Sequence, residues 1–293
     1  MFRSLMIVMG LLAGFQPTLA APWELPMGVK TLTVNNYPMA YRESGSGETV
    51  VLVHGAANDY RYWDALMKSA PAGFRLIALS LRHHYPERWD GKGGRYSVKQ
   101  HAEDLAAFIE ALGVGPVHLV ARSLGGTFAV RMTRDRPELV KKLVLIEGAF
   151  LQLLPPEQRL MQGASLPAIR KEVQARFEQG DIDGGLKVWT DRDAPGLGEL
   201  GGEERRQLRR DNAWTLIIML EPGGPVTCTD LAGLAMPVLL MQGEKTAPRF
   251  ARIVETTRKC LPSPEFVKIP EAGHDIVKNT TATQAALFTF LKK

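Results

Sequence analysis

The sequence predicts an α/β protein with a mostly parallel central sheet, helices on both faces of that sheet, and an inserted helical cap. Short apolar runs alternate with helical stretches through the first half of the chain, which is the order expected of a parallel sheet. Strand patterns vanish between Gly148 and about Leu234, where helical segments alternate with loops rich in glycine and proline. The strand pattern returns at Met236.

The first half of the chain supplies most of the expected strands. Each is a short run of apolar or alternating residues, at 30–35, 37–42, 48–54, 74–80, 116–120 and 142–147. Helices are expected at 59–68, 97–112 and 127–132. The 97–112 segment has apolar residues at helical spacing, namely Ala102, Leu105, Phe108, Ile109 and Leu112.

The last part of the chain resumes the alternation. Strands are expected at 236–243 and 265–270, and helices at 250–260 and 281–292. The domain organisation that follows is a core made of residues 21–148 and 235–293, interrupted by a helical cap at 149–234.

The N-terminus resembles a secretory signal peptide. Arg3 gives a positive start, an apolar run follows from Leu5 to Phe15, and small residues end at Ala20. This pattern predicts that cleavage after Ala20 removes residues 1–20. The apolar run is too short to span a bilayer. We therefore expect an exported protein, periplasmic or secreted, with no stable membrane span.

Composition excludes several classes of partner. The net charge is +5 over 293 residues, and the lysines and arginines are scattered, so no basic stripe predicts nucleic-acid binding. Cys228 and Cys260 are the two cysteines. Export permits a disulfide between them, and two buried free thiols are an equal alternative. Their spacing matches no metal site, and no nucleotide loop or cofactor motif is present, so we expect neither metal nor cofactor.

A nucleophile elbow is the chemical centre of the sequence. An apolar strand leads to Ser123, and a helical stretch follows it at once. Strand, sharp turn with serine, and helix form this motif. Ala121 and Gly125 keep the turn uncrowded. Alanine at 121 replaces the usual glycine, and it is the mildest replacement available. A chance serine at an ordinary strand–helix joint is the alternative, and the rest of the chain argues against it.

With these motifs in order, the chain resembles the α/β-hydrolase fold proteins that carry a helical cap. His54-Gly55 follows an early strand, the Ser123 elbow comes next, the cap follows a strand ending at Glu147, and Gly273-His274 follows the last strand. The resemblance implies that Ser123 is the nucleophile and that His274 is its base. His54 is expected to be structural.

The oxyanion that develops during acyl transfer needs two hydrogen-bond donors. The amide of Leu124 follows the nucleophile at a helix N-terminus, where the helix dipole favours negative charge. The second donor is expected from the loop after His54-Gly55, at the amide of Ala56.

The acid of the triad has two candidates. The family commonly places an aspartate after the strand ending at Gly243, but Thr246 stands there. Some members carry the acid after the strand that follows the nucleophile helix, as fungal zearalenone lactonases and some dehalogenases do; that position is Glu147. An unpaired carboxylate would be costly to bury at the end of this apolar strand, and a histidine partner would explain it. Glu147 is therefore preferred, with Glu244 as the alternative acid.

The leading function is an exported serine hydrolase that cleaves carboxylic esters or lactones through an acyl-enzyme. Carbon–carbon or amide hydrolysis on the same triad, and non-catalytic binding of a small ligand, are the alternatives. Epoxide hydrolases and haloalkane dehalogenases are disfavoured because they use aspartate at the elbow. Apolar cap residues predict a small, apolar ester or lactone substrate: Leu151, Leu153, Leu154, Trp189, Trp214, Leu216, Ile217, Ile218 and Met219.

Overall fold

The computed structural model describes residues 22–93, 96–191, 202–218, 225–278 and 280–293. The expected signal peptide and Met219 lie outside these residues. The strands are β1 (Lys30–Val34), β2 (Tyr37–Gly45), β3 (Gly47–Val53), β4 (Gly73–Leu79), β5 (Val117–Arg122), β6 (Val140–Ile146), β7 (Val238–Gly243) and β8 (Glu265–Ile269). The α-helices are α1 (Asp64–Lys68), α2 (Val98–Ala111), α3 (Leu124–Asp135), α4 (Pro156–Glu178), α5 (Ile182–Asp191), α6 (Glu203–Asp211), α7 (Thr215–Ile218), α8 (Cys228–Ala232), α9 (Pro248–Cys260) and α10 (Thr280–Lys292).

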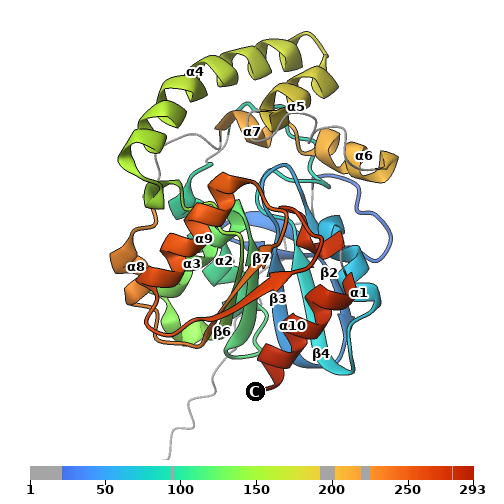
Figure 1. The fold of residues 1–293 in the computed structure, drawn as a ribbon. Coiled ribbons are helices and arrows are strands. Elements are labelled where there is room, and N and C mark those ends of the chain that lie inside the picture. The colour runs from blue at the N-terminus through green and yellow to red at the C-terminus, as the bar shows by residue number, and fades with distance from the viewer. Residues whose placement is uncertain (1–21, 94–95, 192–201, 219–224, 279) are drawn as a thin grey trace, which may run out of the picture.

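The described strands form one sheet in the order β1-β2-β4-β3-β5-β6-β7-β8 (Figure 1). β1 pairs with β2, and β2 with β4, in antiparallel register, whereas every pairing from β4 through β8 is parallel. The predicted class, an α/β protein with a mostly parallel sheet, is confirmed. Parallel strands place their carboxyl ends at one edge, and this edge positions the site described below.

The sheet separates two apolar cores. Alternate residues of β3 enter different cores, because successive side chains of a strand point to opposite faces. Val51 and Val53 pack with α2, α3 and α9, whereas Val50 and Leu52 pack with α1 and α10. Helices therefore cover both faces, as the sequence predicts.

The segment between β6 and β7 lies over one end of the sheet (Figure 1), where α4, α5, α6 and α7 gather. A small apolar core joins α4, α5 and α7 and includes Val173, Phe177, Leu186, Trp189 and Leu216. Leu208 of α6 instead belongs to the core that contains α1 and α10. Ala57, which follows β3, belongs to the same core. The cap helices therefore stand over the carboxyl end of the parallel strands.

The last helix of this inserted segment packs elsewhere. α8 contacts α3 and α9 beside the sheet, and Cys228 at its start forms a disulfide with Cys260 at the end of α9. The two Cα atoms are 4.9 Å apart. Of the two possibilities left open by the sequence, the structure contains the disulfide.

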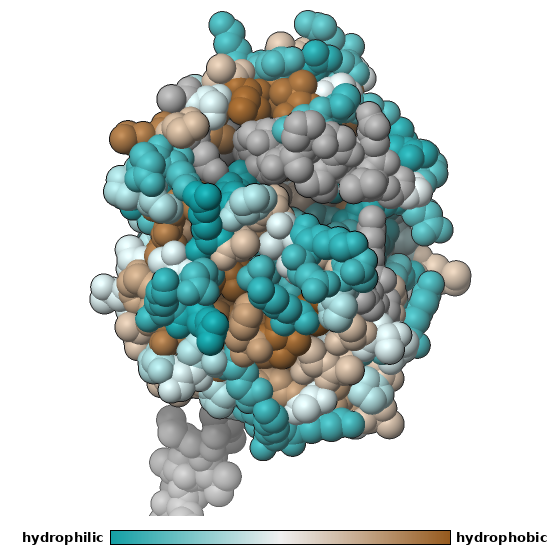
Figure 2. Space-filling model, in the orientation of Figure 1, coloured by the Kyte–Doolittle hydropathy of each residue, from teal (hydrophilic) through white to brown (hydrophobic). Residues whose placement is uncertain are grey.

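The surface view shows mainly hydrophilic residues, with apolar areas among them, including one over the cap (Figure 2). Among the described residues, no helix combines the length and the apolar character that crossing a bilayer requires.

Candidate active site

Ser123 occupies a strained turn between β5 and α3. Its φ of 50° and ψ of −121° are rarely adopted by a residue with a side chain. The amide of Ser123 donates to the carbonyl of Ile146 at 2.9 Å, and its carbonyl accepts from Gly126 and Ala149. The turn is held by β6 and by its own helix, so its strain is sustained by the surrounding structure.

Two glycines allow the loop after β3 to press against this turn. A Cβ on Gly125 would lie 2.3 Å from the carbonyl oxygen of His54. A Cβ on Gly55 would lie 3.0 Å from the Cβ of Ser123. Ala121, where the usual motif has glycine, is fully buried in the core that includes α2 and α3. The close approach therefore needs glycine on the far side of Ser123 and tolerates a methyl at 121.

His274 lies between Ser123 and Glu147. Its Nε2 is 3.2 Å from the Oγ of Ser123, and its Nδ1 is 2.6 Å from the Oε2 of Glu147. The ring stacks on Phe250 with the centroids 3.8 Å apart, which fixes its orientation. Three segments far apart in the sequence thus form one hydrogen-bonded chain.

Glu147 is fully buried and has a positive φ of 45°. Its Oε1 accepts from the amide of Gly243 at 2.7 Å, and its Oε2 accepts from the hydroxyl of Thr246 at 2.7 Å. Thr246, at the place where the family pattern has aspartate, therefore contacts the carboxylate of Glu147. A buried carboxylate with these partners avoids the cost of an unsatisfied charge.

The alternative acid, Glu244, lies away from the imidazole. It is exposed, and its carboxylate accepts from the amide of Glu271 at 3.0 Å. Of the two acid candidates, the structure brings Glu147 to His274.

Burial lowers the pKa of His274 below its ordinary value, and the neighbouring Arg122 cation lowers this pKa further. The hydrogen bond and the charge of Glu147 act in the opposite direction. The balance favours the neutral imidazole near pH 7, and a neutral imidazole can accept a proton from a hydroxyl.

The two expected oxyanion donors flank the turn. The amide of Leu124 begins α3, and the amide of Ala56 lies in the loop after β3. Within the described chain, neither amide donates a hydrogen bond to another residue. Asn58 donates to the carbonyl of Ala56, and Ala57 has a φ of 47°. The loop therefore has a defined shape beside Ser123.

His54 connects this loop to the next one. Its Nδ1 lies 2.8 Å from the carbonyl oxygen of Gly55, and its Nε2 accepts from the amide of Leu81 at 3.0 Å. Burial lowers the pKa of His54 to about 4, so the ring is neutral. These contacts agree with the expected structural role.

Sequence reasoning missed Arg122, the residue before Ser123. Arg122 is only 6% exposed, and one of its guanidinium nitrogens donates to the carbonyl of His274 at 3.3 Å. Its position beside the nucleophile was visible in the sequence, but a single arginine gives no sign of whether it is buried.

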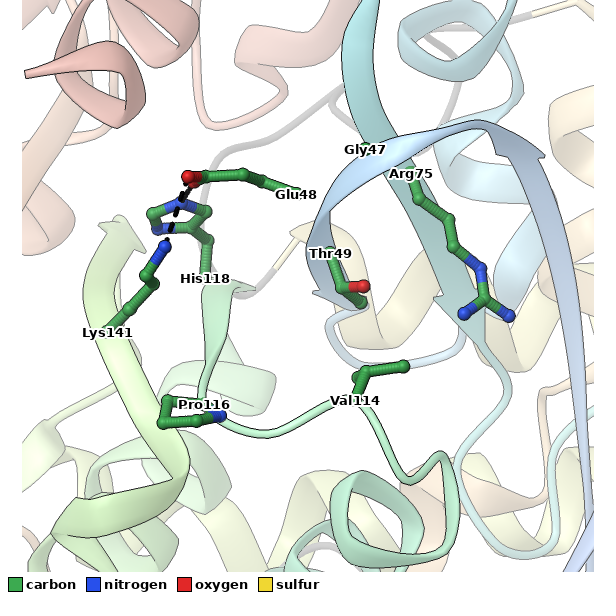
Figure 3. Close-up of a pocket in the computed structure, with 8 residues that line it drawn as sticks. All are labelled: Gly47, Glu48, Thr49, Arg75, Val114, Pro116, His118 and Lys141. Carbon is green, nitrogen blue, oxygen red and sulfur yellow. Dashed lines mark hydrogen bonds and ion pairs between the residues drawn. The ribbon is translucent and has the colours of Figure 1, made fainter.

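A pocket of about 630 Å³ lies at the other end of the sheet (Figure 3). Its lining comes from the starts of β3, β4, β5 and β6 and from the loop before β5: Gly47, Glu48, Thr49, Arg75, Val114, Pro116, His118 and Lys141. Because Ser123 and Glu147 follow the opposite ends of β5 and β6, this pocket does not include the Ser123 site.

The comparisons with known proteins agree with this fold. A family model described as alpha/beta hydrolase fold matches residues 48–179. The chain is 25% identical over 272 residues to an uncharacterized protein of Mycobacterium tuberculosis, covering 85% of this chain and 76% of that protein. It is 26% identical over 269 residues to a 2-(acetamidomethylene)succinate hydrolase of Mesorhizobium japonicum, covering 84% of this chain and 88% of the relative.

Among solved structures, a thermophilic esterase from Thermogutta terrifontis superposes with a TM-score of 0.67 and 24% identity. The match covers 90% of this chain and 97% of that one. The chain has the α/β-hydrolase fold. Small molecules are the typical substrates of this fold class.

Proposed function

We propose that this protein is a serine hydrolase that cleaves carboxylic esters or lactones. The observation that carries the proposal is the hydrogen-bonded chain from Ser123 through His274 to Glu147. A serine hydroxyl is a weak nucleophile unless a base accepts its proton. Here the base lies at hydrogen-bond distance and is held by a buried carboxylate.

In the proposed reaction, the Oγ of Ser123 attacks the carbonyl carbon of the ester while its proton passes to the Nε2 of His274. Glu147 stabilises the imidazolium that forms and keeps the ring in orientation. The amides of Leu124 and Ala56 stabilise the oxyanion. His274 then gives its proton to the departing alcohol oxygen, which leaves an acyl-enzyme on Ser123.

Water completes the cycle. His274 removes a proton from a water molecule, whose oxygen attacks the acyl carbonyl and releases the acid. For a lactone, the alcohol remains joined to the acyl group, and the product is one hydroxy acid.

Amide hydrolysis is the second candidate. It is supported by the relative that spans most of this chain, because its name describes a hydrolase whose substrate carries an acetamido group. Carbon–carbon hydrolysis would use the same three residues, and a small ligand bound without turnover would lie beside them. Parallel assays of activated anilides and esters separate the first two reactions.

We also propose that part of the substrate is apolar and that the protein is exported. Trp189, Leu216 and Ile217 belong to the apolar core of the cap, which stands over the end of the sheet where Ser123 lies. The N-terminal pattern supports a periplasmic or secreted location. N-terminal sequencing of the exported protein should then begin at Ala21.

The test is hydrolysis of p-nitrophenyl esters by residues 21–293, with labelling by a serine-directed phosphonate. Ser123→Ala should lower kcat/KM by about 10³-fold or more and abolish labelling, because the attacking oxygen is gone. Ser69→Ala, which removes an exposed hydroxyl, is the matched control and should retain both. A wild-type protein that neither hydrolyses any ester nor reacts with the phosphonate would contradict the proposal.

A further inference from the structure

Two arginines lie over the ring of Tyr62 beside the His274 loop, and a third, Arg209, stands next to one of them on α6. Arg122 precedes the nucleophile, whereas Arg205 and Arg209 come from α6 in the cap. The guanidinium carbons of Arg122 and Arg205 lie 4.7 Å and 5.7 Å from the centroid of the Tyr62 ring. Core and cap therefore bring cations to the same place, next to the base of the proposed triad.

Arg122 lies at the rim of the Ser123 site. Besides its contact with the carbonyl of His274, its Nη1 lies 2.9 Å from where a Cβ on Gly55 would be. The guanidinium is thus between the loop that carries Ala56 and the loop that carries His274. Its Nε is buried without a hydrogen-bond partner among the described residues.

Arg205 is balanced by one carboxylate. It forms an ion pair with Asp275, whose other oxygen accepts from the hydroxyl of Tyr62 at 2.7 Å. Since Asp275 follows His274 directly, this pair joins α6 to the His274 loop. Both oxygens of Asp275 are engaged, by Arg205 and Tyr62.

Arg209 stands one helical turn after Arg205, so the two side chains share a face of α6. Arg209 is half-buried, and no carboxylate in the described chain forms an ion pair with it. Burial, together with the charges of Arg205 and Arg122, lowers the pKa of Arg209 to about 10. The next arginines of α6 differ, because Arg206 and Arg210 both pair with Glu203.

Positive charge therefore exceeds negative charge beside the His274 loop. Three guanidiniums face one carboxylate, Asp275, while Glu147 is committed to His274. We propose that Arg122 and Arg209, with Arg205, bind a carboxylate of the substrate, so that the enzyme acts on small anionic esters. This inference rests on the proposed hydrolase function and specifies its substrate class.

The three arginines have the chemistry that a carboxylate ligand requires. Guanidinium groups bind carboxylates through paired, charge-assisted hydrogen bonds. A carboxylate on the substrate would relieve the repulsion among these cations and would anchor the ester near Ser123. The rest of the ester can still contact apolar residues.

The experiment compares esters that differ by one charge. Monomethyl adipate and dimethyl adipate place the carboxylate, or its neutral ester, on the acyl half. 4-Acetoxybutanoate and its methyl ester place it on the alcohol half. Turnover is followed by pH-stat titration, and binding to Ser123→Ala by calorimetry. In at least one pair, the anionic member should have at least about tenfold higher kcat/KM and tighter binding.

Arg209→Gln should reduce that preference about tenfold, because the uncompensated cation is removed. Arg206→Gln is the matched control: it removes the same charge from the same helix at a residue paired with Glu203, and it should leave the preference unchanged. A preference that survives Arg209→Gln, or falls equally in Arg206→Gln, would overturn the inference.

The two proposals fail in different ways. If both members of each pair are hydrolysed equally well, the hydrolase stands and the anionic substrate class is wrong. If no ester is hydrolysed but Ser123→Ala binds the anions through Arg209, the carboxylate site stands and the hydrolase is wrong. If Ser123→Ala binds neither member preferentially and no preference appears in turnover, the carboxylate site is rejected.

Discussion

Two histidines of this sheet each contact a glutamate, and they lie at opposite ends of the parallel strands. His274 meets Glu147 at the carboxyl end, with 2.6 Å between nitrogen and oxygen. His118 meets Glu48 at the amino end, with 2.5 Å (Figure 3). Judged by this one distance, the two pairs are equivalent.

Their surroundings differ in three ways. The side chain of Glu147 is fully buried, whereas that of Glu48 is 51% exposed and also pairs with Lys141. The second ring nitrogen of His274 meets the hydroxyl of Ser123, but the Nδ1 of His118 is buried with no partner in the described chain. Ser123 and Glu147 both have a positive φ, whereas His118 and Glu48 have a negative φ.

The difference shows what a histidine–carboxylate pair needs before it can do chemistry. A nucleophile must lie on the free ring nitrogen, and the carboxylate must be screened from water so that its charge acts on the ring. The strained turn supplies the first condition and the buried end of β6 supplies the second. The pair in Figure 3 meets neither and is best explained as a structural contact.

The largest expected effect comes from removing each histidine in turn. His274→Ala should lower kcat by about 10³-fold or more, since the proposed acceptor of the Ser123 proton is removed. His118→Ala should keep kcat within about twofold while lowering Tm by a few degrees, because a buried side chain is lost. Ester kinetics and thermal melts on both variants provide the measurement. Equal kinetic losses would mean that the two pairs do not differ in function.

The next effect concerns the carboxylates. Glu147→Gln preserves shape but not charge, so the imidazolium loses its counter-charge and kcat should fall about 10²- to 10⁴-fold. Glu48→Gln is the matched substitution at the other pair and should change kcat by less than about twofold. Glu244→Gln, measured beside them, tests the alternative acid. A large loss in Glu244→Gln with a small one in Glu147→Gln would reverse the assignment.

Much of this fold was predictable, because its strands are short apolar runs and its helices have regular apolar spacing. The turn at Ser123 was visible because the serine stands between such a strand and such a helix. Glu147 could be singled out because a carboxylate at the end of an apolar strand needs a partner.

Other features depend on contacts between distant segments. Thr246 reaches Glu147 across 99 residues of sequence, and nothing local indicates it. The arginines of α6 look like any charged, solvated helix face, and only the folded cap brings Arg205 and Arg209 to Arg122. The disulfide likewise depends on α8 packing against α9.

The smallest expected effect concerns Thr246, whose hydroxyl contacts the carboxylate of Glu147. Thr246→Val removes the hydroxyl that donates to the Oε2 of Glu147, while the amide of Gly243 and the ring of His274 remain. We expect kcat to fall about three- to tenfold, because the carboxylate is then held by one hydrogen bond fewer and positions the ring of His274 less well.

The pH profile gives the same variant a second readout. The pKa of His274 lies below its ordinary value. Since the neutral ring is the proposed base, kcat/KM of the wild type should be constant near pH 7. It should decline only as the pH falls through a pKa below about 6.5. In Thr246→Val, less of the charge on Oε2 is shared with a donor, so the imidazolium is stabilised more strongly. The decline should therefore move to higher pH, by a few tenths of a unit. A profile from pH 4.5 to 8.5 covers both the decline and the constant region. A shift of the decline to lower pH would mean that Thr246 does not act through the carboxylate of Glu147.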